Sequence, residues 1–313
     1  MQAKPIFNVI KSGILTTFQD MGRTGYQRYG VPVSGAMDRF ALQYANILVG
    51  NQRNTACLEI TLIGPALEAR TPLTISITGA NLEPKVNGKV KPMWQSFRMD
   101  IGDKLTFGKH QSGVRAYLAV AGGFESPVIF GSRSTDLNSG FGAKLNEADT
   151  IKGFPIDGKH GVGLSRQCIP TYESSVEVAV VKGPHTDYFT KSKIDHFFAT
   201  TYRVDSSSNR MGYRLNSPQS VLERSHNIWS DAVPFGGIQI PPNNQPIILM
   251  ADRQTTGGYP RIGTVISSDL PKIAQLIPNG EIRFRPVSIE TAQEHVIESE
   301  KQLAAFAQFR SHL

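Results

Sequence analysis

Short strand-like segments separated by glycine and proline limit what this chain can fold into. Leu73–Thr78 alternates apolar and polar residues, and Val86-Asn87-Gly88-Lys89-Val90 carries the Asn-Gly pair of a tight hairpin turn. Similar segments follow at Lys104–Phe107, Val114–Ala121, Val176–Lys182, Pro246–Met250 and Glu281–Arg285. The 29 glycines and 19 prolines of the chain separate such segments. This pattern predicts a mainly β fold with a few helices, built as a sandwich or barrel.

The clearest helical segment is Met37–Val49, whose apolar residues fall on one stripe. Ser34 or Asp38 stands near its start as a cap, and Gly50 follows its end. We expect this helix to pack its apolar stripe against a sheet.

Two further segments have helical periodicity, Thr186–Phe198 and Ser288–Phe309, the latter after Pro286. The residues expected to face inward are Tyr188, Phe189 and Phe197 in the first, and Ile289, Ala292, Val296 and Leu303 in the second. The last helix should therefore close the fold as an amphipathic cover.

A chain of 313 residues with 40% hydrophobic residues is long enough for two domains with buried cores. Between Asp149 and Tyr172, glycines and prolines interrupt the regular patterning. We place the boundary there, which predicts an N-terminal domain of residues 1–155 and a C-terminal domain of residues 170–313 that includes the closing helix.

Charge and cysteine usage argue against several classes of protein. The net charge of +7 comes from scattered lysines and arginines without a dense basic run, so we expect no nucleic-acid partner. No apolar stretch approaches membrane-spanning length, and the first residues lack the pattern of a secretory signal. Only Cys57 and Cys168 are present, which fits a reduced cytoplasm better than a disulfide framework.

The sequence carries none of the common self-contained catalytic motifs. A GxxxxGK[ST] phosphate loop, a GxGxxG fingerprint and an HExxH zinc motif are all missing, and the seven histidines are not spaced as a metal cluster. An Ala-Met-Lys-Met attachment site is missing too, so we expect no covalently attached biotin. The missing zinc motif and the spacing of the histidines lead us to expect no metal site formed by this chain alone.

Polar, glycine-rich segments take the place of those motifs. In Gln19–Tyr26, Asp20 and Arg23 could contact a charged ligand, or pair to hold a loop together. In Gly131–Thr135, small residues, hydroxyls and a guanidinium suit recognition of phosphate or carboxylate, and a tight turn is an equal alternative. The residues in question are Ser132, Arg133, Ser134 and Thr135.

The segment Gly30–Asp38 leads into the first predicted helix, where free N–H groups could bind an anion. Simple capping is the favoured alternative. Downstream, Asn46, Asn51 and Glu59 lie among apolar residues, so each requires a hydrogen-bond partner or a ligand.

The second half of the chain has the densest run of functional groups. Arg210 and Arg214 flank a turn and could clamp an anion, or project into solvent on either side of a hairpin. After the strand that ends at Met250, Asp252 is the best candidate for an acid, a base or a metal-facing carboxylate, and Arg253 for an anion contact. The additional candidates for ligand binding are Gln239, Gln254, Thr255 and Tyr259.

Six separated motifs, in consistent order between Gly13 and Pro286, carry a family resemblance. They are Gly13–Arg23, Ser34–Asp38, Ala45-Asn46, Gly131–Thr135, Arg210–Leu215 and Asp252–Pro260. The chain resembles the allophanate hydrolase subunit 2 family, which includes KipA-like proteins understood as the C subunit of 5-oxoprolinase. The family is in turn similar to the carboxyltransferase part of urea carboxylase.

The resemblance implies two cyclophilin-like β-barrel domains and a KipI-like B subunit as partner. Such B and C subunits are understood to activate 5-oxoproline with ATP and Mg²⁺, after which an A subunit opens the ring to glutamate. It also implies little activity without these partners. Residue chemistry adds that Arg23, Arg133, Arg210 or Arg253 could stabilise charge on a transferred phosphoryl group, with Asp252 or Asp20 holding the metal or a proton.

Two other functions fit the same resemblance. One is a carboxyltransferase component that accepts carboxybiotin from another chain for a urea-type substrate. The other is a regulatory protein that binds a KipI-like inhibitor without any turnover.

Overall fold

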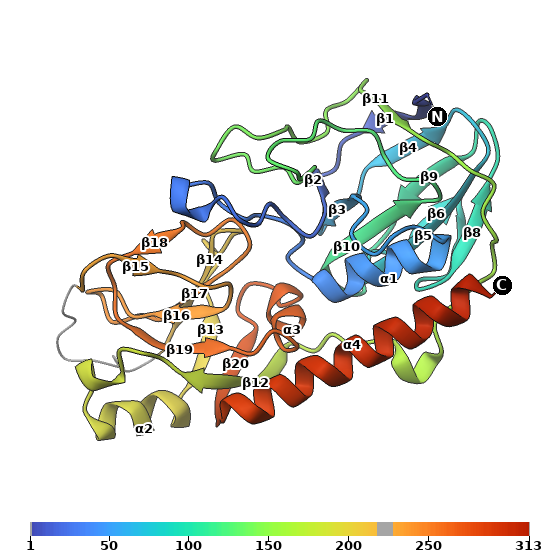
Figure 1. Cartoon of the computed structure of the whole chain (residues 1–313). Helices are drawn as coiled ribbons and strands as arrows, with labels where there is room; N and C mark the ends of the chain where they lie inside the picture. Colours follow the sequence, from blue (N-terminus) through green and yellow to red (C-terminus); the bar gives the residue numbers. More distant parts are fainter. Residues whose placement is uncertain (1, 218–227, 313) are drawn as a thin grey trace. The chain divides into compact units, whose positions relative to one another are not determined.

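The computed structural model describes residues 2–217 and 228–312, and the predicted mainly β architecture is confirmed (Figure 1). The chain forms two compact units. Unit 1 comprises Met1–Arg23, Ser34–Tyr172 and Gln302–Leu313, and unit 2 comprises Thr24–Val33 and Glu173–Lys301. The predicted boundary region thus lies in unit 1 up to Tyr172, and the end of the closing helix also belongs to unit 1.

Unit 1 contains two sheets. The six-stranded sheet has the order β11-β1-β4-β9-β6-β7, and the five-stranded sheet has the order β2-β3-β10-β5-β8. The strands are β1 (Lys4–Lys11), β2 (Leu15–Gln19), β3 (Cys57–Thr61), β4 (Ala66–Ala69), β5 (Leu73–Asn81), β6 (Pro84–Val86), β7 (Lys89–Val90), β8 (Ser96–Met99), β9 (Lys104–Phe107), β10 (Ser112–Val120) and β11 (Thr150–Gly153). A 3-10 helix, η2, covers Arg166–Cys168.

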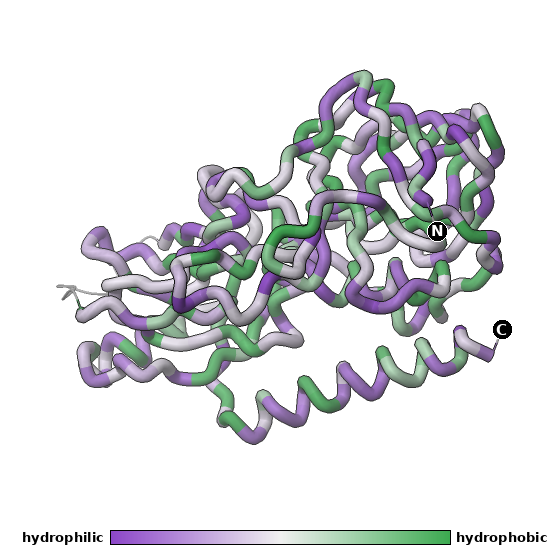
Figure 2. The backbone as a smooth tube through the Cα atoms, turned by 45° about the horizontal axis from the view of Figure 1, so that its top comes forward, coloured by the Kyte–Doolittle hydropathy of each residue, from purple (hydrophilic) through white to green (hydrophobic). Residues whose placement is uncertain are grey.

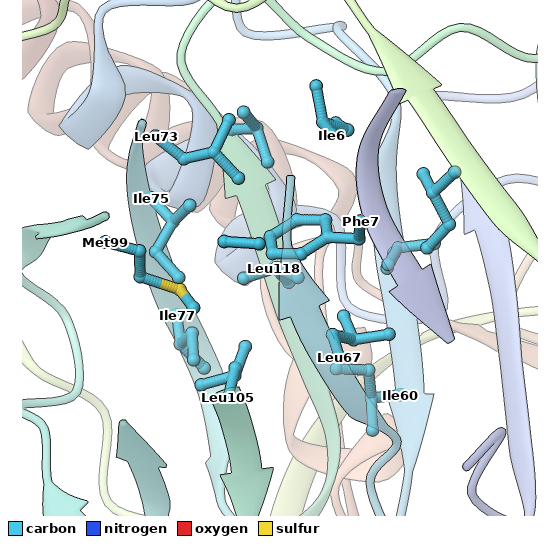
Figure 3. Close-up of a cluster of buried hydrophobic side chains, with 14 of the residues drawn as sticks. Ile6, Phe7, Ile60, Leu67, Leu73, Ile75, Ile77, Met99, Leu105 and Leu118 are labelled. Carbon is cyan, nitrogen blue, oxygen red and sulfur yellow. The ribbon is translucent and has the colours of Figure 1, made fainter. Parts of the chain in front are cut away.

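The core of unit 1 is formed by side chains from both sheets, as Figure 3 shows. Phe7 of β1 and Leu67 of β4 come from one sheet, and Ile60, Ile75 and Leu118 come from the other. All five are fully buried. Burial of one such side chain stabilises a fold by about 1.5–3 kcal/mol. Because a shift of one residue would turn these side chains to the other face of the sheet, the alternating pattern specifies how the strands pair.

The helix α1 (Arg39–Val49) confirms the strongest helix prediction. Asp38 caps its start, because the side chain of Asp38 accepts a hydrogen bond from the backbone N–H of Ala41 at 2.9 Å. On the sheet below, the hydroxyls of Ser76 and Thr78 donate to the carbonyls of Ala45 and Ala41, each at 2.6 Å. Side-chain hydrogen bonds thus tie the helix to β5 in addition to apolar packing.

The predicted hairpin at Asn87-Gly88 joins β6 to β7. Asn87 has a φ of 51° and Gly88 a φ of 80°. Positive φ at both central residues is what a two-residue hairpin turn requires, and Asn-Gly adopts it at the lowest steric cost.

Unit 2 is built on a closed barrel with the strand order β12-β19-β16-β17-β14-β13-β20. Its strands are β12 (Ser175–Lys182), β13 (Thr201–Val204), β14 (Gly212–Asn216), β16 (Gly237–Gln239), β17 (Ile247–Leu249), β19 (Arg261–Val265) and β20 (Glu281–Val287), with a separate pair β15 (Asp231–Ala232) and β18 (Thr256–Gly257). Its helical elements are η1 (Gln27–Tyr29), η3 (Thr186–Tyr188), α2 (Lys191–Ala199), α3 (Leu270–Ala274) and the first part of α4 (Ile289–Ser311).

The helix predicted over Thr186–Phe198 is wrong in its first half. Phe189 has extended backbone angles, which separate η3 from α2. Phe197 is fully buried and stacks on Phe284 with ring centroids 4.8 Å apart, whereas Tyr188 is 49% exposed and does not face inward. Propensity alone could not locate this break, because the aromatic pattern continues across it.

The last helix, α4, exists as predicted but is not an apolar cover along its whole length. Leu303 is buried, whereas Ile289 and Val296 are exposed. Figure 2 shows hydrophilic and hydrophobic residues mixed along this helix. Within residues 2–217 and 228–312, no helix combines the length and the apolar character that crossing a bilayer requires.

A buried polar network fixes the start of α1. The hydroxyl of Tyr117 donates to Glu59 at 2.7 Å and accepts from the backbone N–H of Asp38 at 2.8 Å. Glu59 also accepts from the backbone N–H of Met37 at 3.0 Å, and its other oxygen lies 3.7 Å from Nε of Arg115. Glu59 therefore has protein partners and supports the fold.

Asn46 and Asn51 are partnered in the same way. The amide of Asn46 donates to the carbonyl of Thr55 at 2.6 Å, and the amide of Asn51 donates to the carbonyl of Val120 at 2.8 Å. The three polar residues that the sequence places among apolar neighbours are thus satisfied by the fold itself.

Tyr117→Phe should change how the stability of unit 1 depends on alkaline pH. Burial, and then the adjacent Glu59 carboxylate, raise the pKa of Tyr117 well above its ordinary value of 10.0. Below about pH 10 the tyrosine is neutral in both the folded and the unfolded chain, and its contribution to stability is fully present. Above about pH 10 the unfolded chain loses this proton while the folded chain keeps it, so the free energy of unfolding falls by about 1.4 kcal/mol per pH unit. Urea unfolding from pH 9.5 to pH 11.5 should show a slope smaller by one proton in the variant. Equal slopes would contradict the assignment.

Candidate functional site

The carboxylate of Asp20 organises the polar cluster of unit 1. Its Oδ1 accepts from the hydroxyls of Ser132 and Ser134, each at 2.6 Å, and from the backbone N–H of Gly22 at 2.8 Å. Its Oδ2 accepts from the backbone N–H of Arg133 at 2.6 Å. The structure thus brings two predicted segments together, and these contacts give Asp20 the role of positioning residues 132–134.

Arg23 supports the same segment from a nearly inaccessible position, with 1% of its surface exposed. Its guanidinium donates to the carbonyls of Ile129 and Ser134 and lies 4.9 Å from the ring centroid of Phe141. The carbonyl of Thr135 accepts from the amide of Gln19 at 2.9 Å. Contact of Arg23 with a ligand therefore requires this packed environment to open.

A cavity of about 770 Å³ lies beside this segment. Its lining includes three of the predicted residues, Arg133, Ser134 and Thr135. Asp20, Arg23 and Ser132 do not line it and support the wall from behind. The other charged residues of the lining, which sequence reasoning did not identify, are Glu125, Lys144, Asp149 and Lys152.

In unit 2, Asp252 forms a two-pronged ion pair with Arg210. Nε of Arg210 lies 2.8 Å from one carboxylate oxygen, and Nη2 lies 2.8 Å from the other. The side chains of Arg210 and Asp252 are 11% and 5% exposed. The backbone N–H of Asp252 also donates to the carbonyl of Arg210 at 2.9 Å. This geometry joins the end of β17 to the start of β14, and it uses both oxygens of the carboxylate predicted to act as an acid or base.

Arg253 turns toward the backbone of its own unit. Its Nε donates to the carbonyl of Val233 at 3.0 Å, and its Nη1 donates to the carbonyl of Met250 at 3.4 Å. The guanidinium lies 5.5 Å from the ring centroid of Phe235. Next along the chain, the carbonyl of Thr255 accepts from the N–H of Val233 at 3.1 Å. Arg253 and Thr255 thus hold the loop after β17 in place.

A second cavity, of about 430 Å³, gathers the remaining predicted residues. Arg214, Gln239, Gln254 and Tyr259 all line it, although they come from three separate stretches of the chain. The rest of its lining is Asn209, Met211, Gly212, Pro241, Pro242, Asn243, Ile247 and Leu249. Among the described residues that line it, Arg214 is the one with a cationic side chain. The cavity is thus suited to a small molecule with amide-type groups and one negative charge.

Asn209 and Asn243 are polar lining residues that were not among the predicted site residues, and Asn243 lies outside every predicted motif. It follows Pro241 and Pro242, a combination that indicates a turn and gives no sign of a ligand. Only the pairing of β16 with β17 reveals that this turn lies over the cavity.

The described residues contain no group of three or more His, Cys, Asp or Glu side chains arranged to hold a metal ion. Mg²⁺ is usually bound by one or two carboxylates together with waters and substrate phosphates. Glu125 and Asp149, in the lining of the unit 1 cavity, are of that kind. The residues present therefore fit a magnesium–phosphate ligand better than a metal held by protein alone.

Arg210→Met should lower the free energy of unfolding by about 3–5 kcal/mol, because it removes the guanidinium that donates to both oxygens of the buried Asp252 carboxylate. Replacing both residues, as Arg210→Met with Asp252→Leu, should restore most of that loss. Arg203→Met is the matched control, since the Arg203–Glu281 pair is 67% and 38% exposed and is expected to be worth less than about 1 kcal/mol. Denaturant unfolding of the four proteins measures the effect. A single variant as stable as the double would contradict it.

Comparisons with known proteins agree with this architecture. The carboxyltransferase domain, subdomain A and B, family matches residues 29–286. The C subunit of 5-oxoprolinase from Escherichia coli (strain K12) is 37% identical over 295 residues, covering 92% of this chain and 93% of that protein. The C subunit of 5-oxoprolinase from Haemophilus influenzae is 33% identical over 283 residues, covering 88% and 89%.

Among solved structures, the crystal structure of the K. lactis urea amidolyase superposes with a TM-score of 0.89 at 30% identity. The match covers 98% of this chain and 20% of that much longer chain. The fold of both units, the matched residues and the extent of these similarities lead to one conclusion. The chain belongs to the carboxyltransferase domain, subdomain A and B, family.

Proposed function

We propose that this protein is the C subunit of an ATP-dependent 5-oxoprolinase. The observation that carries the proposal is the 37% identity to the corresponding Escherichia coli protein, which extends over nearly the full length of both chains. The unit 2 cavity supports it, because 5-oxoproline is a small lactam with one carboxylate. Such a ligand matches a lining of amides with a single cation, Arg214.

The lactam of 5-oxoproline is a stable amide, so ring opening requires activation. Transfer of a phosphoryl group from ATP to the lactam oxygen makes the ring carbon susceptible to attack, while charge collects on the phosphoryl oxygens. Arg133, Lys144 and Lys152 share the unit 1 cavity and are suited to phosphate oxygens. Arg23, Arg210 and Arg253 are held by carbonyls or by Asp252, so we assign them supporting roles.

The two bacterial relatives are each one subunit of a 5-oxoprolinase, which implies an assembly with other chains. We propose that the partners are a KipI-like B subunit and an A subunit, and that the latter completes ring opening to L-glutamate. ATP and Mg²⁺ are proposed to act in that assembly.

A carboxyltransferase activity is the second candidate. It is favoured by the family match and by the similarity to the K. lactis urea amidolyase. In that case the amide-lined cavity of unit 2 would receive the cyclic ureido group of a carboxybiotin that another chain carries.

Reconstitution with the A and B subunits tests the proposal. The complete assembly should release glutamate from 5-oxoproline only when ATP and Mg²⁺ are present, and each subunit alone should be inactive. Glutamate is measured by an enzyme-coupled assay, with ATP hydrolysis followed in parallel.

The same preparation incubated with urea, bicarbonate and a biotinylated carrier protein provides the comparison. Turnover with urea and none with 5-oxoproline would replace the first function by the second. An intact assembly that turns over neither substrate would indicate the purely regulatory role.

A further inference from the structure

We propose that Gln239 recognises the substrate by pairing with a cis-amide edge, that is, with the neighbouring N–H and C=O of a lactam ring. The inference rests on the proposed function for the identity of the ligand, 5-oxoproline. It names Gln239 as the residue that determines which ligand is bound, and the cis-amide edge as the feature to which Gln239 forms hydrogen bonds.

The position of Gln239 in the barrel directs its side chain to the cavity. Ile238 on β16 is fully buried, and side chains alternate along a strand, so Gln239 faces the opposite side of the barrel wall. There it lines the unit 2 cavity although only 2% of its surface is exposed. Gln239 thus forms part of the cavity floor.

The side-chain amide of Gln239 has no hydrogen-bond partner among residues 2–217 and 228–312. A buried primary amide can donate two hydrogen bonds and accept two, and leaving them unmade is costly. Elsewhere in the chain, the buried amides of Asn46 and Asn51 are satisfied by backbone carbonyls. In contrast, the amide of Gln239 borders the cavity, where a ligand can supply its hydrogen bonds.

Gly257 provides the space in which this amide lies. A Cβ atom at Gly257 would stand only 2.5 Å from Nε2 of Gln239, closer than carbon and nitrogen approach without displacement. The glycine on β18 therefore leaves room for the amide of Gln239 close to the backbone of this strand. A side chain at position 257 would therefore displace this amide.

The amide of Gln239 presents a carbonyl oxygen and an N–H on one planar edge. A partner that satisfies both must carry an N–H and a C=O on the same side, which is the arrangement of a cis amide. Open-chain secondary amides are trans, and the cis form costs about 2.5–4 kcal/mol. A ring enforces the cis form, so Gln239 selects lactams and cyclic ureas over open-chain secondary amides.

Arg214 gives the second element of recognition. Arg214 is exposed, and it is the cationic residue of the described cavity lining. A carboxylate on the ring carbon next to the lactam nitrogen would be attracted to it. Gln239 thus contacts the lactam edge and Arg214 the carboxylate of the same small molecule, so their effects on binding can be measured separately.

Direct binding measurements on the assembled complex test the pairing. Isothermal titration compares 5-oxoproline with its lactone analogue, in which a ring oxygen replaces the N–H. The wild-type protein should prefer the lactam about tenfold, because the lactone cannot donate to the glutamine oxygen. Gln239→Leu should reduce this preference to less than about twofold. The near-isosteric Gln239→Glu should weaken both ligands, because it loses the donor to their C=O, and should keep the preference, because its carboxylate still accepts from the lactam N–H.

Three further variants serve as checks. Gly257→Ala should also reduce the preference, since the added methyl group displaces the amide without removing it. Arg214→Gln should weaken binding of both ligands equally and leave the preference intact. Gln293→Leu, an exposed amide on α4, should bind like the wild type. Thermal unfolding of each variant establishes that it is folded.

The outcomes separate this inference from the proposed function. A tenfold preference that survives in Gln239→Leu, or its absence in the wild type, overturns the pairing even if ATP-dependent glutamate release is observed. A preference that depends on Gln239 supports the pairing even if no glutamate is released, in which case the proposed enzyme is wrong and a cyclic urea is the ligand to test.

Discussion

The convergence of backbone and hydroxyl donors on the carboxylate of Asp20 is the constraint on which the first cavity depends. Three short hydrogen bonds fix Ser132, Arg133 and Ser134 relative to the end of β2, and a fourth holds the backbone of Gly22. The Arg210–Asp252 pair performs the same task in unit 2. In both units, therefore, the charged groups that attract notice in the sequence mainly support the walls, and neighbouring residues line the cavities.

The difference between charged residues that support the walls and neutral amides that line the unit 2 cavity has an energetic reason. A buried carboxylate requires several donors or a paired guanidinium, so one that is fully satisfied inside the protein has little left to offer a ligand. Burying a neutral amide costs less free energy than burying a charge, so its hydrogen-bonding groups can remain available to a ligand. A lining of Gln239, Gln254 and Asn243 beside one exposed arginine is consistent with binding that relies on hydrogen-bond geometry more than on charge.

Local patterns predicted the elements well where packing agreed with them. The helix over Arg39–Val49, the Asn87-Gly88 hairpin and the strands β5, β9, β10, β12, β17 and β20 follow from periodicity and turn chemistry. The break at Phe189 and the exposed half of α4 did not follow, because tertiary contacts decide them. For the sites, the sequence identified the polar segments. It could not distinguish Asp252, which is paired within the protein, from Gln239, because that depends on partners from other strands.

The absent side chain at Gly257 has a consequence for how relatives of this protein could diverge. One methyl group there would tilt the neighbouring amide while leaving the strand pairing of Gly257 with Asp231 in place. Ligand preference in such a barrel can therefore drift through a position that never touches the ligand. A change of specificity of this kind would leave every residue that lines the cavity identical, and the difference would be one methyl group at position 257.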